Sequence, residues 1–165
     1  MKKERAERLV ERFGKKILAS DGMKIEKKLT QHGDVSVYQH SLNVARMCIR
    51  IAGALPIKVH VGSLIRGALL HDYFLYDWHE PDKSHRLHGF SHAKHAVRNA
   101  QRDFGLNRIE RNMIASHMFP LNLTIPRYRE SLIVGLADKI CAVQEGTSSL
   151  VRYIRRRARR TVKRR

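Results

Sequence analysis

Apolar residues recur at helical spacing along most of this chain, and no segment shows the alternating pattern of a strand. Leu9, Phe13 and Ile17, for example, recur every fourth position and predict a helix over residues 3–19. We expect further helices over residues 36–52, 56–70, 91–104, 107–118 and 127–145. Because 165 residues with 42% apolar content can bury one core, the pattern predicts a single all-α domain.

Turn-forming residues mark the expected ends of these helices. Ser36 can cap one N-terminus, Pro56 can start the next helix, and Gly105 and Gly146 can end two later ones. Residues 73–89 are rich in aromatic and turn residues and predict an irregular loop. We therefore expect one helical domain over residues 1–147, followed by an arginine-rich helix or tail over residues 148–165.

Positive charge is concentrated at the C-terminal end of the chain. The formal net charge is +18, and residues 150–165 contain nine Arg and Lys residues and no acid. Such a segment predicts contact with a polyanion, either nucleic acid or an anionic membrane. The alternative is a solvated basic terminus without a dedicated partner.

The cysteines and the hydropathy of the chain indicate where the protein works. Cys48 and Cys141 are far apart in the sequence and form no CxxC pair, which gives no indication of a disulfide framework or a thiolate zinc site. No apolar run approaches the ~20 residues that a membrane span requires. The charged N-terminus has no signal-peptide core. We expect a cytoplasmic protein without a membrane span.

A His-Asp doublet, His71-Asp72, ends the apolar run over residues 64–70. His40 lies upstream in a second apolar, helix-periodic segment, and Asp138 lies downstream in a third. Imidazole and carboxylate side chains that project from separate helices can converge inside a helical bundle and hold a metal ion there. The alternative for each residue is structural, as a hydrogen-bonded core histidine or a buried ion-pair partner.

Two further histidines, His88 and His117, extend this candidate ligand set. Neutral imidazoles with carboxylates suit Fe, Mn, Co, Ni or Zn rather than Ca²⁺. The six residues exceed what one ion normally takes, so we expect one or two divalent ions and favour two. His92, one turn after His88, is an alternative ligand. We expect the remaining histidines not to be ligands: His32, His60, His79, His85 and His95.

The ordered set His40, His71-Asp72 and Asp138 resembles the signature of the HD superfamily of metal-dependent phosphohydrolases, over residues 36–145. With His88 and His117 it resembles the dinuclear subset, which includes diadenosine tetraphosphate hydrolases and some cyclic-dinucleotide phosphodiesterases. The resemblance implies an HD-domain helical bundle. It also implies that His40, His71, Asp72 and Asp138 hold one ion, while Asp72 bridges to a second ion at His88 and His117.

This resemblance implies hydrolysis of a nucleotide or a related phosphoester or phosphoanhydride by a hydroxide that the metal ions activate. We expect Lys139 and Arg66 to bind the phosphoryl oxygens, with Arg127 and Arg129 as weaker candidates. Asp77 is expected to orient water or to protonate the leaving group, and the alternative is a solvated loop acid. Four aromatic side chains either stack on a nucleobase or seal the end of the bundle: Tyr73, Phe74, Tyr76 and Trp78.

Two other functions are compatible with the same residues. One is an HD-type di-iron oxygenase, since a minority of the superfamily activates O₂ on this ligand set. The other is a non-catalytic nucleic-acid-binding module in which the metal is structural and the basic tail makes the contact.

Overall fold

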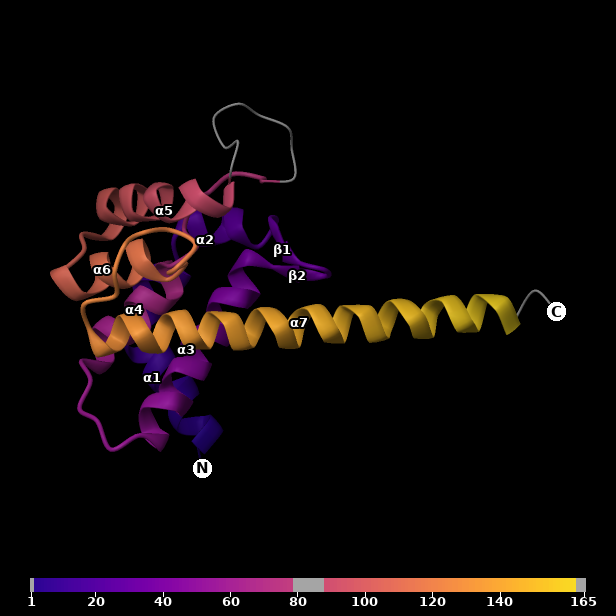
Figure 1. The fold of residues 1–165 in the computed structure, drawn as a ribbon, viewed down its shortest axis with the longest axis horizontal. Helices are drawn as coiled ribbons and strands as arrows, with labels where there is room; N and C mark the ends of the chain where they lie inside the picture. The colour runs from indigo at the N-terminus through magenta and orange to yellow at the C-terminus, as the bar shows by residue number, and fades with distance from the viewer. Residues whose placement is uncertain (1, 79–87, 163–165) are drawn as a thin grey trace.

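The computed structural model describes residues 2–78 and 88–162. Within them the chain forms seven helices and one antiparallel hairpin, which confirms the predicted all-α class (Figure 1). The elements are α1 (Lys2–Leu18), α2 (Asp21–Glu26), β1 (Thr30–His32), β2 (Val35–Ser36), α3 (Val37–Ala54), α4 (Val61–Leu70), α5 (His88–Phe104), α6 (Arg108–Ser116) and α7 (Arg129–Val162).

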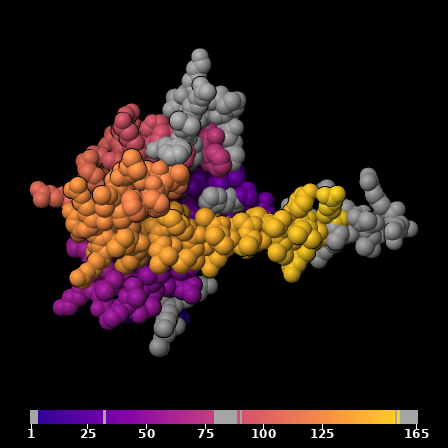
Figure 2. Space-filling view, viewed as in Figure 1, coloured from indigo at the N-terminus to yellow at the C-terminus, as the bar shows by residue number. Residues whose placement is uncertain are grey.

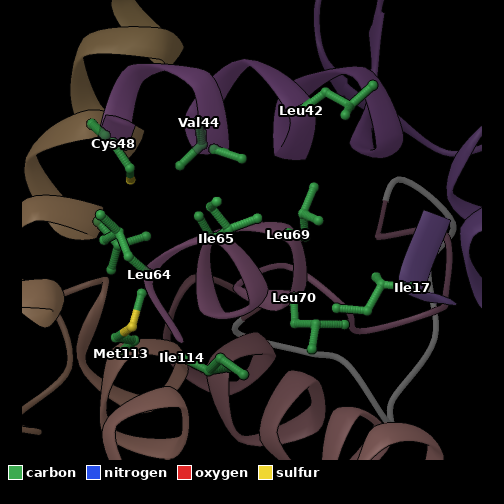
Figure 3. Packing of buried hydrophobic residues seen from close by; sticks show 14 of the residues in the cluster. Ile17, Leu42, Val44, Cys48, Leu64, Ile65, Leu69, Leu70, Met113 and Ile114 are labelled. Atoms are coloured by element: carbon green, nitrogen blue, oxygen red, sulfur yellow. The ribbon is translucent and has the colours of Figure 1, made fainter. Parts of the chain in front are cut away.

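The core of the bundle lies around α4, which packs against α1, α3, α6 and α7. Almost all of α4 is apolar, and Leu64, Ile65, Leu69 and Leu70 are at most 1% exposed. These side chains pack between Val44 and Cys48 of α3 and Met113 and Ile114 of α6 (Figure 3). Because α4 is buried on several sides, the polar doublet at its C-terminal end is carried into the interior of the molecule.

Local hydrogen bonds explain where several helices begin. The Ser36 hydroxyl accepts a hydrogen bond from the backbone N–H of Gln39, so Ser36 caps α3 as predicted. Asn107 and Glu110 form a reciprocal capping box at the start of α6. Gly105 has a φ of +60° and ends α5 at the predicted position.

The structure differs from the sequence-based boundaries in three places. It adds the short helix α2 and the hairpin β1–β2. Strand β1 has three residues and β2 has two, which are too few to show an alternating pattern. Helix α4 begins after His60 rather than at Pro56, because the His60 ring accepts the backbone N–H of Ser63 and so caps the helix there. Helix α7 continues through Gly146 to Val162, so the predicted end at Gly146 is wrong.

The predicted irregular loop over residues 73–89 is partly described. Residues 73–78 contain no helix or strand, α5 already begins at His88, and residues 79–87 lie outside the described residues. None of the described helices is both long and apolar enough to cross a membrane. The predicted division of the chain at residue 147 stays a prediction, and α7 passes through it without a break.

Candidate metal centre

Four of the predicted ligands meet in the interior, although they come from three separate helices. His40 lies within α3, His71 and Asp72 directly follow α4, and Asp138 lies within α7. His40 Nε2 is 3.0 Å from Asp138 Oδ1, and His71 Nε2 is 3.6 Å from the same oxygen. His71 Nε2 is also 3.4 Å from Asp72 Oδ2. All four side chains are buried, so these nitrogen and oxygen atoms face one another away from bulk water.

A second group forms on the other side of Asp72. His92 of α5 and His117, directly after α6, each place Nε2 3.4 Å from Asp72 Oδ1, and the two Nε2 atoms are 2.9 Å apart. The group Asp72, His92 and His117 is buried and has its ligand atoms close enough for one ion. The side chain of His88, the residue expected here from the sequence, lies outside the described residues.

Asp72 therefore presents one carboxylate oxygen to each group. Oδ2 faces His71 at 3.4 Å and His40 at 3.9 Å, whereas Oδ1 faces His92 and His117. Gln31 of β1 also donates a hydrogen bond from Nε2 to Oδ2. This is the geometry of a carboxylate shared between two neighbouring sites.

The second ring nitrogen of three histidines is held in place by the protein. His40 donates from Nδ1 to Glu145 Oε2 at 2.8 Å. His71 and His117 donate from Nδ1 to backbone carbonyls, those of Ala68 at 2.9 Å and Ile114 at 2.8 Å. Metal-binding histidines are oriented in this way, because fixing one N–H aims the other nitrogen at the ion.

The buried histidines and carboxylates of the two groups shift one another's pKa values. Burial alone would lower the pKa of His40, but hydrogen bonds to Asp138 and Glu145 outweigh it and raise that pKa to about 10. Burial would raise the pKa of Asp72, yet the facing His71, His117 and His92 hold it well below its usual range. Burial lowers the pKa of His117, so this imidazole favours its neutral form.

Two buried atoms at the centre lack any hydrogen-bond partner in the part of the chain that is described: His71 Nε2 and Asp72 Oδ1. Buried polar atoms are normally paired, since an unpaired one costs about 1–3 kcal/mol. A cation between the two atoms and their neighbours would satisfy both. The nitrogen and carboxylate donors suit divalent transition metals, so the residues fit the metal that the sequence predicts.

A cavity of about 580 Å³ opens beside this centre. Its polar wall includes Asp72, His92, His117 and Asp138, together with Lys139. The remaining wall is largely apolar and is formed by Trp78, Met118, Phe119, Pro120, Leu121 and Ala142. A small molecule with a charged end and a flat apolar end would fit such a space.

Lys139 lines the cavity as a candidate for binding phosphoryl oxygens. Its Nζ donates to the backbone carbonyls of His117 at 3.3 Å and Gly135 at 3.2 Å, which holds the ammonium group beside His117. Arg66 lies elsewhere. Its Nε donates to Glu110 at 2.8 Å and its Nη2 donates to the carbonyl of Gly105 at 3.0 Å, and Arg66 does not line the cavity. These contacts favour a structural role for Arg66.

The other loop and surface candidates divide in a similar way. Trp78 lines the cavity and donates from Nε1 to the carbonyl of Thr30 at 3.2 Å. Tyr73 and Phe74 are buried, and the Tyr73 hydroxyl donates to Asp103, so both belong to the packing at the end of the bundle. Tyr76, Asp77, Arg127 and Arg129 are not among the described residues that line the cavity.

Three residues around the centre were not predicted from the sequence. Glu145 anchors His40 and also accepts a hydrogen bond from Asn43 at 2.8 Å. Glu145 follows Asp138 by seven positions, about two helical turns, and this spacing is the one signal that could have indicated a shared face. Gln31 and Glu26 come from the hairpin and from α2, two elements that the sequence did not indicate.

Comparison with known proteins identifies the fold family. The family model for the HD domain matches residues 37–143, a segment that contains His40, the His71-Asp72 doublet, His92, His117 and Asp138. Neither the search of curated proteins nor the search of solved structures found a match. Since the matched segment covers most of the chain and includes all of the candidate ligands, this protein belongs to the HD domain family.

Proposed function

We propose that this protein is a metal-dependent phosphohydrolase that acts on a nucleotide or a related phosphoester or phosphoanhydride. The observation that carries the proposal is the position of Asp72, whose two oxygens face two histidine groups on the wall of a cavity that also contains Lys139. The HD domain is typical of metal-dependent phosphohydrolases, and the two histidine groups beside Lys139 suit the same chemistry.

The proposed ligands follow from the two groups. His40, His71, Asp72 and Asp138 form the first site, and Asp72, His92 and His117 form the second. His88 remains the sequence-based candidate for the second site, and His92 is the histidine that the described geometry favours. When bound, two divalent ions would lower the pKa of shared solvent and neutralise charge on the phosphoryl oxygens.

The side chains of the protein would supply the rest of the catalysis. The Lys139 ammonium would bind a non-bridging oxygen and stabilise the charge that develops on the phosphoryl group. Trp78 and Phe119 offer apolar surfaces on which a nucleobase can pack. Glu145 would keep the His40 ring oriented throughout turnover. A role for Asp77 in proton transfer stays a prediction.

The direct test is hydrolysis of a nucleotide panel by the protein loaded with Mn²⁺, Co²⁺ or Fe²⁺. Asp72→Ala should lower turnover by at least on the order of 10³-fold, because it removes the shared carboxylate. Asp34→Ala, which removes an exposed acid, is the matched control and should leave turnover unchanged. If fully loaded protein hydrolyses none of the panel, the proposal fails. Oxygen uptake by the iron-loaded protein would then favour the oxygenase.

A further inference from the structure

The last part of α7 extends beyond the helical bundle. Residues 129–145 pack against α3, α4 and α6, and Ile133, Val134, Ala137 and Cys141 are buried there. The C-terminal part of the helix projects beyond the bundle (Figures 1 and 2), and Arg152 Nε within it lies 3.3 Å from Asp34 Oδ2 of the hairpin turn. The described side chains from residue 150 onwards are exposed. The projecting segment therefore has a surface that the bundle does not cover.

An exposed apolar stripe runs along this helix on the side opposite its buried residues. It consists of Leu132, Leu136, Val143, Leu150 and Ile154, which are 52–68% exposed. Leu132 and Leu150 are 18 residues apart, as are Leu136 and Ile154, and 18 residues make about five full turns of an α-helix. The five side chains therefore fall within about 40° of the helix surface from the bundle to the projecting end, with Lys139 at the edge of the same side. Monomeric proteins rarely leave such a continuous apolar surface in water.

At the projecting end the apolar surface is wide. Successive residues of a helix are rotated by about 100°, so Leu150, Ile154 and Val151 together span about 100° of the helix surface, and Arg157 lies between Leu150 and Tyr153. A seam that packs against one partner helix is narrower, because it uses only the a and d positions of a heptad. The width of the apolar sector favours contact with the apolar region of a lipid bilayer over contact with a single partner helix.

The rest of the projecting surface is basic. Arg155 and Arg157 lie next to the two edges of the apolar sector, whereas Arg152 lies on the opposite side, with its Nε 3.3 Å from Asp34 Oδ2. Residues 146–165 contain no acid. Parallel pairing of two copies would bring these arginines together, and binding to a nucleic acid would leave the apolar stripe in water. An anionic lipid surface can pair its headgroups with the arginines and cover the apolar sector with its acyl chains.

We propose that the outer face of α7 docks on an anionic lipid bilayer, with the apolar stripe in the interface and Arg155 and Arg157 on the lipid headgroups. The long arginine side chains can reach the phosphates while their stems stay on the apolar surface. The contact is peripheral, since no described helix can span a bilayer. It does not depend on the proposed hydrolase activity, because none of the five stripe residues lines the cavity beside the metal centre.

The test is sedimentation of the full-length protein with lipid vesicles. Vesicles with about 30 mol % phosphatidylserine should bind it, and vesicles of phosphatidylcholine alone should bind it much less. Leu150→Asp with Ile154→Asp should weaken binding to the anionic vesicles by at least ~10-fold. The matched control is Gln144→Asp with Ser148→Asp, which makes the same charge change on another side of α7 and should bind within about two-fold of the wild type.

Circular dichroism of both variants verifies that the helix remains folded. Absence of binding by the wild type to anionic vesicles would overturn the proposal. Equal loss in both variants would also overturn it, because charge alone would then explain the binding. Binding of RNA that is insensitive to the stripe substitutions, with no binding of vesicles, would identify the segment as a nucleic-acid contact instead.

Discussion

At the residue scale, Lys139 and Arg66 are two basic residues whose side chains lie in different surroundings. Both were candidates for binding phosphate, because each lies near a proposed ligand in the sequence. The structure places the Lys139 ammonium on the cavity wall, whereas the Arg66 guanidinium contacts the buried Glu110 and the end of α5. The sequence could not separate them, because spacing along a helix does not tell which neighbouring helix a long side chain meets.

Lys139→Ala should therefore lower turnover by about 10–100-fold while the bound metal stays unchanged, since one charge-stabilising contact is removed. The measurements are kcat/KM and metal content on the same preparation. Arg66→Ala is the matched control. It should leave turnover of the folded protein intact and destabilise it by about 1–3 kcal/mol, because Glu110 loses its partner. A larger loss of turnover in Arg66→Ala than in Lys139→Ala would contradict this assignment.

The carboxyl group of Glu26 is a buried group whose surroundings determine its protonation state. It is fully buried, and neither carboxylate oxygen has a hydrogen-bond partner among the described residues. Burial, together with the negative charge of Asp72, raises the pKa of this carboxyl well above its usual value. The unfolded chain releases the proton near the ordinary pKa, whereas the folded protein keeps it. Stability is therefore lost as the pH rises from the ordinary pKa towards the raised one.

Glu26→Gln should remove this pH dependence, because the amide is neutral and has nearly the same shape. The free energy of unfolding of the variant minus that of the wild type should therefore be larger at about pH 8 than at about pH 5. Urea unfolding at the two pH values measures it. Glu11→Gln, at an exposed position on α1, is the control. If the stability difference between Glu26→Gln and the wild type is the same at both pH values, the carboxyl is not held neutral.

Much of the candidate metal centre could be predicted from the sequence at this scale. His40, the His71-Asp72 doublet, His117 and Asp138 each stand out as polar residues in or next to apolar helical segments, and the structure brings them together. His92 and His88 are one helical turn apart, so their spacing alone could not choose between them. Glu145 carried only its seven-residue spacing from Asp138 as a signal, and a carboxylate on a long charged helix is usually solvated.

At the scale of the elements, helical periodicity located most of the helices, and capping residues located some of their ends. Ser36 and Gly105 act as expected. Gly146 does not, because one glycine inside a helix costs only about 1 kcal/mol and the residues on both sides of it favour helix. The hairpin was missed because Thr30–His32 and Val35–Ser36 are too short to alternate recognisably.

This account of α7 predicts that Gly146→Ala stabilises the protein by about 0.5–1 kcal/mol, as alanine restricts the unfolded chain and favours helix. A Cβ atom at this position meets no described atom within 4 Å. Gly33→Ala provides the contrast and should destabilise, because Gly33 has a φ of +60° and its added Cβ would meet Ser149. Unfolding by denaturant measures both. Loss of stability in Gly146→Ala would contradict a continuous α7.

At the scale of the whole molecule, the centre depends on the complete bundle. His40 and Asp138 are 98 positions apart in the chain, and His40 Nε2 lies 3.0 Å from Asp138 Oδ1 in the structure. The hairpin adds Gln31, and α5 and α6 bring His92 and His117 to the other side of Asp72. Helix α7 links this centre to the apolar and basic surface beyond the bundle, so one element contributes both to the site and to the proposed membrane contact.

The metal content of the purified protein tests the central claim most directly. A centre that shares Asp72 between two sites should bind about two equivalents of divalent transition metal per chain. His117→Ala should reduce this to about one equivalent, held by His40, His71, Asp72 and Asp138. His60→Ala, at the histidine that caps α4, should retain both. One equivalent in the wild type, unchanged in His117→Ala, would contradict a two-metal centre.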